Sequence, residues 1–417
     1  MKSKKTVWLV SVNAQPPEHD THLRHRKFAE MLTQKGYDVV IFGGSFLHYA
    51  KFNLINDSRK YITPKYQNIQ YVFFKVPSYS SNGIKRMLSI FLFAWRLFYY
   101  RKKFIKPDII VHNIHVPFDL PVYFAAKRLK SRYVTEVWDL WPEAFVSTGL
   151  VKRSNPLLKL AFNMERFLYE KADKLIFTME GGKDYIIEKG WDIAHGGKID
   201  INKYHYINNG IDLDEFEYNK KNYIIQDNDL SDNSHFKVIY LGSIRLVNNV
   251  QQLIDAAACL QNNPKIKFLI YGDGDERERL IDYCTKYNIN NVIFKEKWVD
   301  IKYVPYILSC SSLNLLNYKK VDTQKYGGSQ GKLFQYLASG KPILSNNMMG
   351  YDIVNKHHAG ISKNISSAQE YAEIINEFAS LDQEKHNTLC TNALNTARFF
   401  DYKYLFKAYF KLINELL

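Results

Sequence analysis

GGSQGKLFQYLASGKPILS, residues 327–345, contains the signals for a loop, a helix and a strand in one short stretch. A glycine-rich loop leads into a helical pattern from residue 332 to 338, and Gly340-Lys341-Pro342 turns the chain into an apolar strand. A helix start presents unpaired N–H groups and the positive end of the helix dipole, which suits a phosphate. Lys332 adds a cation there, and Gln335 can hydrogen-bond whatever the phosphate carries. An ordinary loop between strand and helix accounts for the same residues, so the rest of the chain decides between the two.

Strand and helix patterns alternate along the first half of the chain. Strand patterns cover residues 7–12, 38–43, 69–76, 108–113, 133–137, 174–178 and 204–208, with helical patterns between them. The alternation restarts at residues 236–242 and continues through strand patterns at 267–272, 291–294, 313–316 and 342–345. Strands separated by helices of this length are typical of βαβ units with a parallel sheet. We therefore expect an α/β protein with two doubly wound domains in tandem.

A polar stretch between the two alternations marks the expected domain boundary. Residues 214–235 are charged and rich in Asn and Asp, a composition that predicts a linker. The N-terminal domain would then span residues 1–213 and the C-terminal domain residues 236–398. The aromatic helical pattern of residues 399–417 is expected to pack back on the N-terminal domain. A chain of 417 residues suits two domains of about 200 residues each.

The composition describes a globular protein with an anionic partner. Charged residues make up 24% of the chain, and 57 Lys and Arg against 42 Asp and Glu give a net charge of +15. Such a balance favours nucleic acid, an acidic membrane surface or a phosphorylated substrate. No recognisable nucleic-acid module is present, so we expect no nucleic acid partner.

The four cysteines lie far apart, with no CxxC pair and no histidine at ligand spacing. This spacing predicts neither a metal site nor a disulfide framework and favours a reducing cytoplasm. The N-terminal MKSKKTVWLVSV is basic and then apolar, but its apolar part is too short for a signal peptide and predicts a first strand.

Residues 83–107, GIKRMLSIFLFAWRLFYYRKKFIKP, combine an apolar core with basic ends. The core is shorter than the roughly 20 residues that a membrane span needs. Tryptophan and tyrosines near its end and basic residues on both sides are typical of a helix that lies at a membrane interface. A helix packed on a sheet, with basic ends, is the other interpretation, and both hold if one side is buried while the ends touch lipid.

Candidate ligand contacts in the second domain follow its strands, because ligands of open α/β sheets bind beyond the carboxyl ends of the strands. Gly242 permits a tight turn after the first strand, Arg245 offers a guanidinium for a diphosphate, and Asn249 can cap the next helix. Gly272-Asp273-Gly274 could approach a nucleotide or form a plain turn, and Trp298 could line a base pocket or pack internally.

In the first domain, EVWDLWPEAF (136–145) follows a strand and predicts a sugar-binding surface. Trp141 would pack on the apolar face of a sugar, while Asp139 and Glu143 would accept its hydroxyls; a core role for the tryptophans is the alternative. His115 lies at another strand end, where it could be catalytic or simply hydrogen-bonded structure. Arg24 and His25, at the first helix, are expected to face the same site. No GxSxG, HExxH, Walker or dinucleotide GxGxxG motif is present.

Four of these segments together resemble the GT-B glycosyltransferases, and within them the retaining family 4 enzymes of bacterial polysaccharide assembly. The segments are INNGIDLDEF (207–216), DLWPEAF (139–145), GSIRLVNN (242–249) and GKLFQYLASGKPIL (331–344). An early pattern from Pro16 to Ala29, with PPE and then RH and FA, is similar to one subgroup of that family. The resemblance covers nearly the full length of the chain.

The resemblance implies a GT-B fold, in which the second domain binds a nucleotide-sugar donor, the first binds the acceptor, and the cleft between them closes. It implies a retaining, metal-independent glycosyltransferase that uses a uridine diphosphate-linked sugar and no cofactor. The acceptor would be a lipid-linked sugar or oligosaccharide at the inner face of an anionic membrane, in capsule, exopolysaccharide or O-antigen synthesis. The protein would be cytoplasmic and peripherally membrane-associated.

The resemblance also implies roles for individual residues of this chain. Catalytic roles fall on Arg245, Lys332, Asp139 and His115, and acceptor contacts on Arg24, His25, Trp141 and Glu143. The donor contacts would be Gly242, Ser243, Asn249, Gly272, Asp273, Gly274, Trp298, Gly331, Leu333 and Gln335.

Several family positions are changed in this chain. Ser243 and Asn248 replace an arginine and a lysine of the family, Gly327 and Gln335 replace its paired glutamates, and Trp138 replaces its sugar-binding histidine. Arg245 can take over from the missing cations. These changes keep two other hypotheses open: a non-catalytic GT-B subunit that binds the glycan of a partner transferase, and a nucleotide-sugar epimerase.

Overall fold

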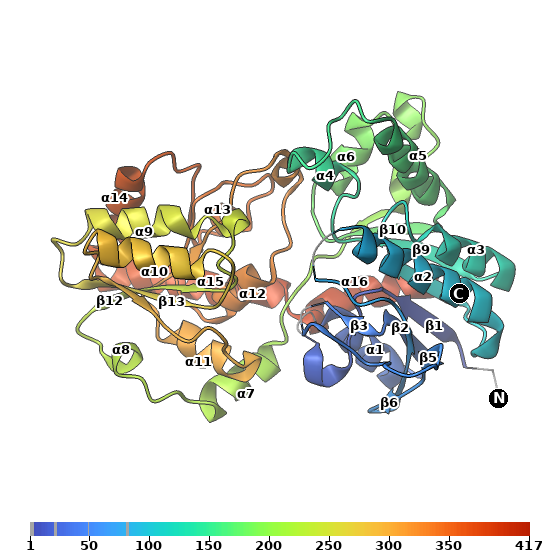
Figure 1. Cartoon of the computed structure of the whole chain (residues 1–417), viewed down its shortest axis with the longest axis horizontal. Helices are drawn as coiled ribbons and strands as arrows, with labels where there is room; N and C mark the ends of the chain where they lie inside the picture. The colour runs from blue at the N-terminus through green and yellow to red at the C-terminus, as the bar shows by residue number, and fades with distance from the viewer. Residues whose placement is uncertain (1–3, 21–22, 49, 81–82) are drawn as a thin grey trace. The chain divides into compact units, whose positions relative to one another are not determined.

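The structure is a computed structural model that describes residues 4–20, 23–48, 50–80 and 83–417. The chain forms two compact units, the first made of residues 1–208 and 405–417 and the second of residues 209–404. Each unit is built around a mainly parallel sheet with helices on both faces (Figure 1). The α/β expectation is therefore confirmed, and the two units are described separately below.

The described part of the first unit has a nine-stranded sheet, whose strands from β11 to β7 are all parallel. Apolar residues fill the central strands because helices cover both faces; all five residues of β1 are buried, for example. The antiparallel strands β5 (Tyr61–Ile62) and β6 (Lys65–Tyr66) both pair with β7. In spatial order the remaining strands are β11 (Tyr204–Tyr206), β10 (Lys174–Phe177), β9 (Arg132–Val137), β8 (Ile109–Asn113), β1 (Thr6–Val10), β2 (Asp38–Gly44) and β7 (Ile69–Phe74).

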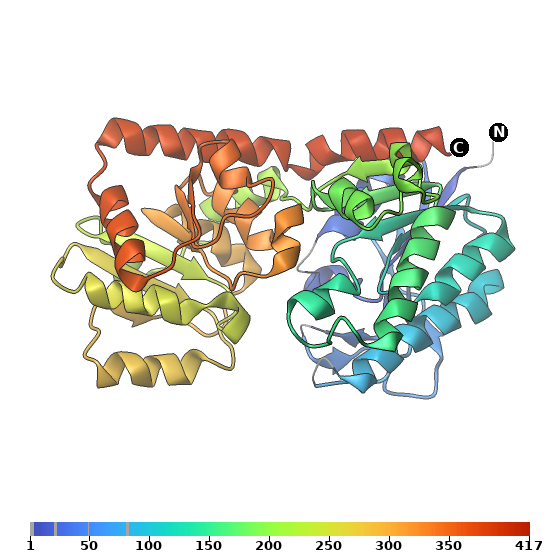
Figure 2. The same cartoon turned by 90° about the horizontal axis from the view of Figure 1, so that it is seen from above.

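Two layers of helices cover this sheet. On one face, α1 (Arg24–Gln34) packs against α16 (Tyr402–Glu415), with the rings of Phe28 and Tyr409 stacked 4.3 Å apart. On the other face, α2 (Ile84–Tyr100), α3 (Leu120–Leu129) and α5 (Pro156–Lys171) lie side by side (Figure 2). Right-handed crossovers explain the division, because the chain runs one way along the sheet through α1 and the opposite way through the other three.

The second unit has a six-stranded parallel sheet in the order β14-β13-β12-β15-β16-β17. One face is covered by α9 (Val250–Cys259), α10 (Arg277–Lys286) and α14 (Ala368–Ala379), and the other by α11 (Val304–Ser309), α12 (Gly331–Ala338) and α15 (Gln383–Phe399). The strands are β12 (Phe236–Leu241), β13 (Ile266–Tyr271), β14 (Val292–Phe294), β15 (Leu313–Leu316), β16 (Ile343–Ser345) and β17 (Gly360–Ser362).

The polar stretch 214–235 is not an extended linker. It forms α7 (Leu213–Asn222) and α8 (Asn228–Ser231), and both helices belong to the second unit. Phe216 and Leu230 anchor them in that unit's core, although the surrounding residues are polar. At the C-terminus, α15 ends at Phe399, Phe400 lies in the core of the second unit, and residues 405–417 belong to the first.

No helix among the described residues has the length and apolarity that crossing a membrane requires. Residues 83–107 form α2, the short 3₁₀ turn Arg101–Lys103 and the segment that leads to β8.

Candidate functional site

The centre of the second unit's site is Lys332, whose side chain lies across the end of β12. Its ammonium donates to the Tyr240 hydroxyl at 2.9 Å and lies 4.5 Å from the centre of that ring. A Cβ atom on Gly242 would come within 2.6 Å of Lys332 Nζ, so Gly242 makes room for the lysine. Burial lowers the pKa of Lys332 to about 8. Lys332 is thus a half-buried cation held at the carboxyl end of a parallel strand.

Two tyrosines fix this arrangement. Tyr240 donates its hydroxyl to the carbonyl of Ser243 at 2.7 Å, which closes the loop after β12. The Tyr336 hydroxyl lies 3.3 Å from both the amide and the carbonyl of Leu241, and so ties α12 to the end of the strand. The start of α12 and the loop after β12 therefore form one structure around Lys332.

The turn Gly272-Asp273-Gly274 braces this loop from the neighbouring strand. A Cβ on Gly272 would lie 2.0 Å from the carbonyl oxygen of Gly242, and one on Gly274 would lie 2.1 Å from that of Ile244. The Ile244 amide donates to the Asp273 carbonyl at 2.8 Å. The two glycines are needed because two strand-end loops touch backbone to backbone. Asp273 itself is exposed.

The loop after β12 contains a hydrogen bond between two of the changed family positions. Ser243 Oγ donates to Asn248 Oδ1 at 2.9 Å, so these two neutral residues satisfy each other. Arg245 is exposed in the same loop. The expectation that Asn249 caps α9 is wrong for its side chain. Asn249 lies at the helix start in the left-handed region, with φ of 48°, and its amide donates instead to Gln252 Oε1 at 2.7 Å.

The other predicted donor contacts surround α12 with different exposures. Gly331 is exposed at the first position of the helix, and Gln335 is half-buried one turn later. Leu333 is buried, and its amide already donates to the Gln330 carbonyl at 3.0 Å. Trp298 is 77% exposed, so the core alternative for this side chain is wrong.

The first unit gathers a charged cluster at the carboxyl end of β9, around the buried Glu136. Arg24 Nε and His25 Nε2 lie 2.9 and 3.2 Å from its two oxygens, and Trp138 donates to it at 3.0 Å. Burial alone would raise the pKa of Glu136, but Arg24 and His25 lower it to about 2. Arg24 is completely buried and also donates to the Asn208 carbonyl at 2.5 Å. The expectation that Arg24 lines an acceptor site is therefore wrong, because the Arg24 guanidinium is buried and paired with the Glu136 carboxylate.

His25 does border a small pocket. Its ring stacks on Trp138 with centroids 5.1 Å apart, and both line a recess together with Asn13 and Gln15. Gln15 is buried, and among the described residues neither polar atom of its amide has a hydrogen-bond partner.

His115 belongs to a second buried cluster, centred on Asp119. The Asp119 carboxylate accepts from the His115 amide and lies 3.1 Å from His112 Nε2. Burial opposes ionisation of Asp119, yet the two histidines lower its pKa overall. His115 Nε2 faces Asn13 Nδ2 at 3.2 Å, and its ring meets that of Trp141 edge to face at 5.5 Å. The structure thus brings His115 and Trp141 together.

Glu143 and Asp139 have different surroundings. Glu143 is buried between Arg153 and Lys189, with Lys189 Nζ at 2.5 Å. Its carboxylate is satisfied by these two cations, so a role in accepting sugar hydroxyls is not supported. Asp139 is exposed beside it in sequence, after the end of β9.

Several residues that build these clusters escape sequence analysis. Tyr240 and Tyr336 look like apolar core residues of a strand and a helix. Arg277 looks like a surface residue of α10, but it is buried and donates to the carbonyls of Gly272 and Lys295 at 2.7 and 2.6 Å. Three sequence signals lie near the recess beside His25: the PPE pattern after Gln15, the RH pair that contains His25, and the segment 136–145 that contains Trp138.

Comparison with known families agrees with this architecture. Residues 25–215 match the family described as "Glycosyltransferase Family 4", and residues 224–396 match the family described as "Glycosyl transferases group 1". The two matches follow one another along the chain, which has the GT-B fold. The predicted fold is confirmed, with one Rossmann-like unit for each family match. A search of curated proteins finds no significant match to the sequence.

Solved structures share the fold over nearly the whole chain. The sucrose-phosphate synthase of Thermosynechococcus elongatus has a TM-score of 0.72 at 16% identity, with 99% of each chain covered. Anabaena Alr3699/HepE, in complex with UDP and glucose, has a TM-score of 0.68 at 17% identity, with 99% of this chain and 100% of that chain covered. The α,α-trehalose 6-phosphate synthase of Burkholderia multivorans has a TM-score of 0.73 at 11% identity, with 99% of each chain covered.

Proposed function

We propose that this GT-B chain is a retaining glycosyltransferase that uses a uridine diphosphate-linked sugar and needs no metal or cofactor. The acceptor is a lipid-linked sugar or an oligosaccharide of bacterial cell-surface polysaccharide synthesis, in capsule, exopolysaccharide or O-antigen assembly. The protein works in the cytoplasm at the inner face of an anionic membrane.

The observation that carries the proposal is Lys332 at the start of α12, directly over Gly242. A cation with a lowered pKa, beside the first turn of a helix and a glycine loop, is suited to a diphosphate. A uridine nucleotide is favoured because HepE, which shares this fold over the whole chain, is in complex with UDP.

The chemistry follows from the charge that develops on the leaving group. The bond between the sugar's anomeric carbon and the diphosphate oxygen breaks, and its electron pair goes to the diphosphate. The acceptor hydroxyl oxygen forms the new bond on the same face of the sugar, and its proton passes to the departing phosphate. Lys332 stabilises the negative charge because the hydrogen bond to Tyr240 already holds its ammonium in position. Arg245, in the loop after β12, is the second cation within the same loop system.

On the acceptor side, the proposal rests on the strand-end clusters of the first unit. His25 and Trp138 border a recess with Gln15, and His115 meets Trp141. The recess measures about 10 Å³, which is room for one water molecule and not for a sugar ring. The proposal therefore places the acceptor against the aromatic rings at these strand ends, which suit the apolar face of a sugar.

The test is transfer by a Lys332→Ala variant. We expect loss of transfer with an unchanged melting temperature, since the substitution removes a half-buried cation and no core packing. Lys286→Ala is the matched control, because Lys286 lies in the last turn of α10, at the other end of the parallel strands. Turnover by Lys332→Ala at the rate of the unmodified protein would overturn the assignment.

A second function is favoured by the Ser243–Asn248 hydrogen bond. Where the family has two cations, these residues satisfy each other at 2.9 Å. A non-catalytic subunit that binds the glycan of a partner transferase would have this feature. It would bind acceptor without turnover and without nucleotide affinity, so nucleotide binding separates the two functions.

A further inference from the structure

The outer side of α2 carries a stripe of large hydrophobic side chains that are open to solvent. Ile84 is 83% exposed, Leu88 45%, Phe91 42%, Trp95 48% and Tyr99 67%. They are separated by three or four residues, so they follow one another along a single side of the helix. Isolated exposed hydrophobic residues are common, but a stripe along a 17-residue helix indicates a surface that binds something.

The opposite side of the same helix explains why the stripe is not needed for folding. Ile90, Phe93, Ala94 and Leu97 are buried and hold α2 against the sheet of the first unit. A helix packed on a sheet needs only this one apolar side, and its outer side is ordinarily polar. The sheet-packing interpretation of residues 83–107 is therefore confirmed for one side of α2, while the other side faces solvent.

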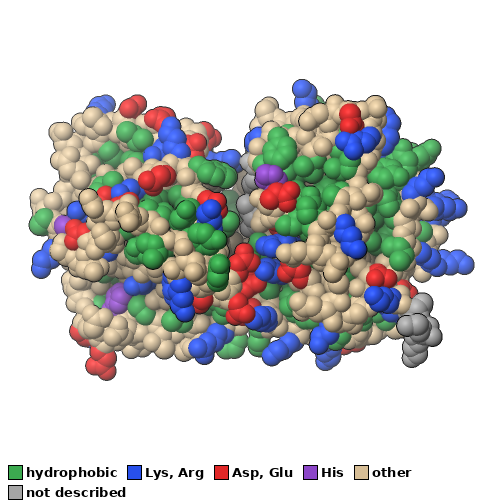
Figure 3. All heavy atoms as spheres, turned by 90° about the horizontal axis from the view of Figure 1, so that it is seen from below, with side chains coloured by type: hydrophobic (Ala, Val, Ile, Leu, Met, Phe, Trp, Pro, Cys, Tyr) green, Lys and Arg blue, Asp and Glu red, His purple; other side chains and the backbone are tan. Residues whose placement is uncertain are grey.

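Positive charge surrounds the stripe. Residues 83–107 contain seven Lys and Arg and no Asp or Glu. Lys102, Lys103 and Lys106 are exposed just beyond the end of α2. The neighbouring α3 adds the exposed Phe124 and has no acidic residue within its bounds. Figure 3 shows hydrophobic side chains gathered on the right of the view, where the first unit lies, with Lys and Arg side chains at the edge.

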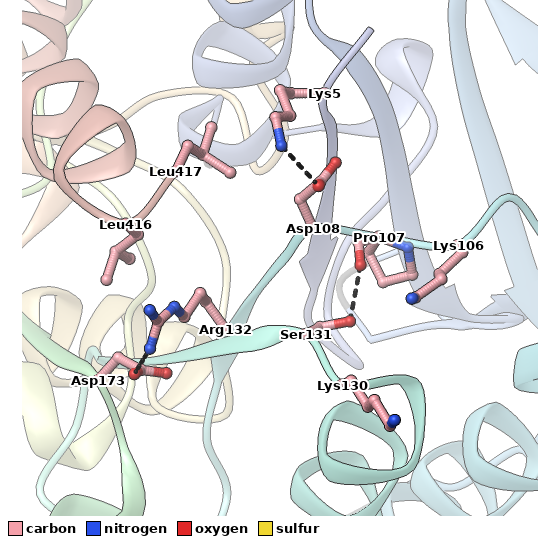
Figure 4. A pocket seen from close by; sticks show the side chains of 10 residues that line it. All are labelled: Lys5, Lys106, Pro107, Asp108, Lys130, Ser131, Arg132, Asp173, Leu416 and Leu417. Atoms are coloured by element: carbon pink, nitrogen blue, oxygen red, sulfur yellow. Dashed lines mark hydrogen bonds and ion pairs between the residues drawn. The ribbon is translucent and has the colours of Figure 1, made fainter. Parts of the chain in front are cut away.

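The basic edge continues into an open hollow of about 510 Å³ at the amino ends of the strands (Figure 4). Lys5 is paired with Asp108 at 3.1 Å, and Arg132 with Asp173 at 3.0 Å. Lys106 and Lys130 line the same hollow, and no ion pair within the described residues involves either of them. Two cations at this edge are thus available to negatively charged groups from outside.

We propose that the α2 surface, meaning the exposed stripe from Ile84 to Tyr99 with Lys102, Lys103 and Lys106, docks on an anionic lipid bilayer. The helix lies in the plane of the interface with its hydrophobic side chains among the acyl chains and its lysines at the headgroups. Trp95 and Tyr99 suit this depth, because aromatic rings with a polar edge favour the membrane interface. This inference deepens the proposed function. It rests on that function only for the reason why the protein docks, which is access to a lipid-linked acceptor.

Charge complementarity selects a lipid surface over a second copy of this chain. Pairing two α2 surfaces would bring two sets of Lys102, Lys103 and Lys106 together, which is unfavourable because none of these lysines has an ion pair within the part of the chain that the structure describes. A bilayer with anionic headgroups matches both parts of the α2 surface: its acyl chains can contact the hydrophobic stripe, and its negative headgroups can pair with the lysines.

Co-sedimentation with vesicles tests the proposal on the full chain. We expect sedimentation with phosphatidylcholine–phosphatidylglycerol vesicles and little with phosphatidylcholine alone. Replacing Lys102, Lys103 and Lys106 with Gln should lower the partition coefficient onto these vesicles about 100-fold, because each lysine near an anionic surface strengthens binding about fivefold. A Leu88→Ser, Trp95→Ser variant should also lose binding, since it removes the centre of the stripe.

A matched control carries the same charge change on the second unit. Lys221, Lys265 and Lys286 are exposed there, and their replacement with Gln should leave the vesicle partition within about twofold of the unmodified protein. Circular dichroism melts establish that each variant is folded, which the exposure of every replaced side chain favours. Equal loss in the control variant would mean that only net charge matters and would overturn the docking surface.

Other occupants give distinct results that also overturn the proposal. If the protein does not bind anionic vesicles but forms dimers, and the Leu88→Ser, Trp95→Ser variant is monomeric, the α2 surface binds a second copy of the chain. A chain that binds neither vesicles nor itself would leave the stripe to a protein partner. Failure of the proposed function is recognised separately. Uridine diphosphate binding, measured as an increase in melting temperature, does not involve the α2 surface.

Discussion

Raising the pH should weaken the binding of uridine diphosphate, because the free protein holds Lys332 with a lowered pKa. Burial lowers that pKa from 10.5 to about 8. A diphosphate beside the ammonium restores a favourable environment for the charge and raises the pKa again. Binding therefore takes up a proton above pH 8, and the affinity must fall as the pH rises through this value.

The magnitude follows from the two pKa values. With about 8 in the free protein and about 10.5 in the complex, the Kd at pH 9 should be about tenfold higher than at pH 7. Below pH 7 the lysine is charged in both states, and its contribution to the pH dependence disappears.

Isothermal titration calorimetry at pH 7, 8 and 9, in two buffers with different ionisation heats, measures both the Kd and the proton uptake. Lys332→Arg is the control, because arginine stays charged throughout this range and any remaining slope belongs to the nucleotide. Equal pH slopes in the unmodified protein and in the Lys332→Arg variant would refute the contact between Lys332 and the diphosphate.

Three further predictions concern the buried groups of the first unit. Glu136→Gln should lower the free energy of unfolding by about 3–5 kcal/mol in urea denaturation, because Arg24 would keep a buried charge without its partner; a loss below 1 kcal/mol would contradict the role of the pair. Burial raises the pKa of Glu165 to about 8, so the folded state binds the extra proton between pH 4.5 and 8, and stability should fall as the pH rises through this window. Glu165→Gln should remove that decline, and an unchanged slope would rule out this residue as its source. Tyr409→Ala should lower the free energy of unfolding by about 3 kcal/mol, because it removes the buried ring that stacks on Phe28. The melting temperature of this variant should fall, while that of the exposed Tyr404→Ala should not.

The general architecture could be predicted from the sequence because it depends on periodicity. The strand patterns and the helices between them are local, and a parallel sheet with right-handed crossovers then leaves few arrangements. The stretch 327–345 likewise gives its loop, helix and strand correctly. The helices of the segment 214–235 cannot be predicted from its sequence, because a few separated anchors such as Phe216 and Leu230 decide its packing and leave no periodic apolar pattern among the many polar residues.

The site was less predictable for a different reason. Arg24 and Glu136 are 112 residues apart in sequence, and only the fold shows that they neutralise each other. Glu143 is similarly satisfied by Lys189, 46 residues away. The close approach of Gly272 to Gly242 depends on two strands being neighbours. By contrast Lys332, Gly331 and Gly242 follow from local rules about helix starts and strand ends.

The most direct measurement of the central claim is thermal stability with uridine, guanosine, adenosine and thymidine diphosphates at millimolar concentration. A ligand at 100 times its Kd stabilises by about 2.7 kcal/mol, which raises the melting temperature of a domain of this size by about 5–10 °C. We predict this shift with uridine diphosphate, and its absence in Lys332→Ala. No shift with any of the four nucleotides would contradict a donor site at Lys332 and would favour the non-catalytic subunit.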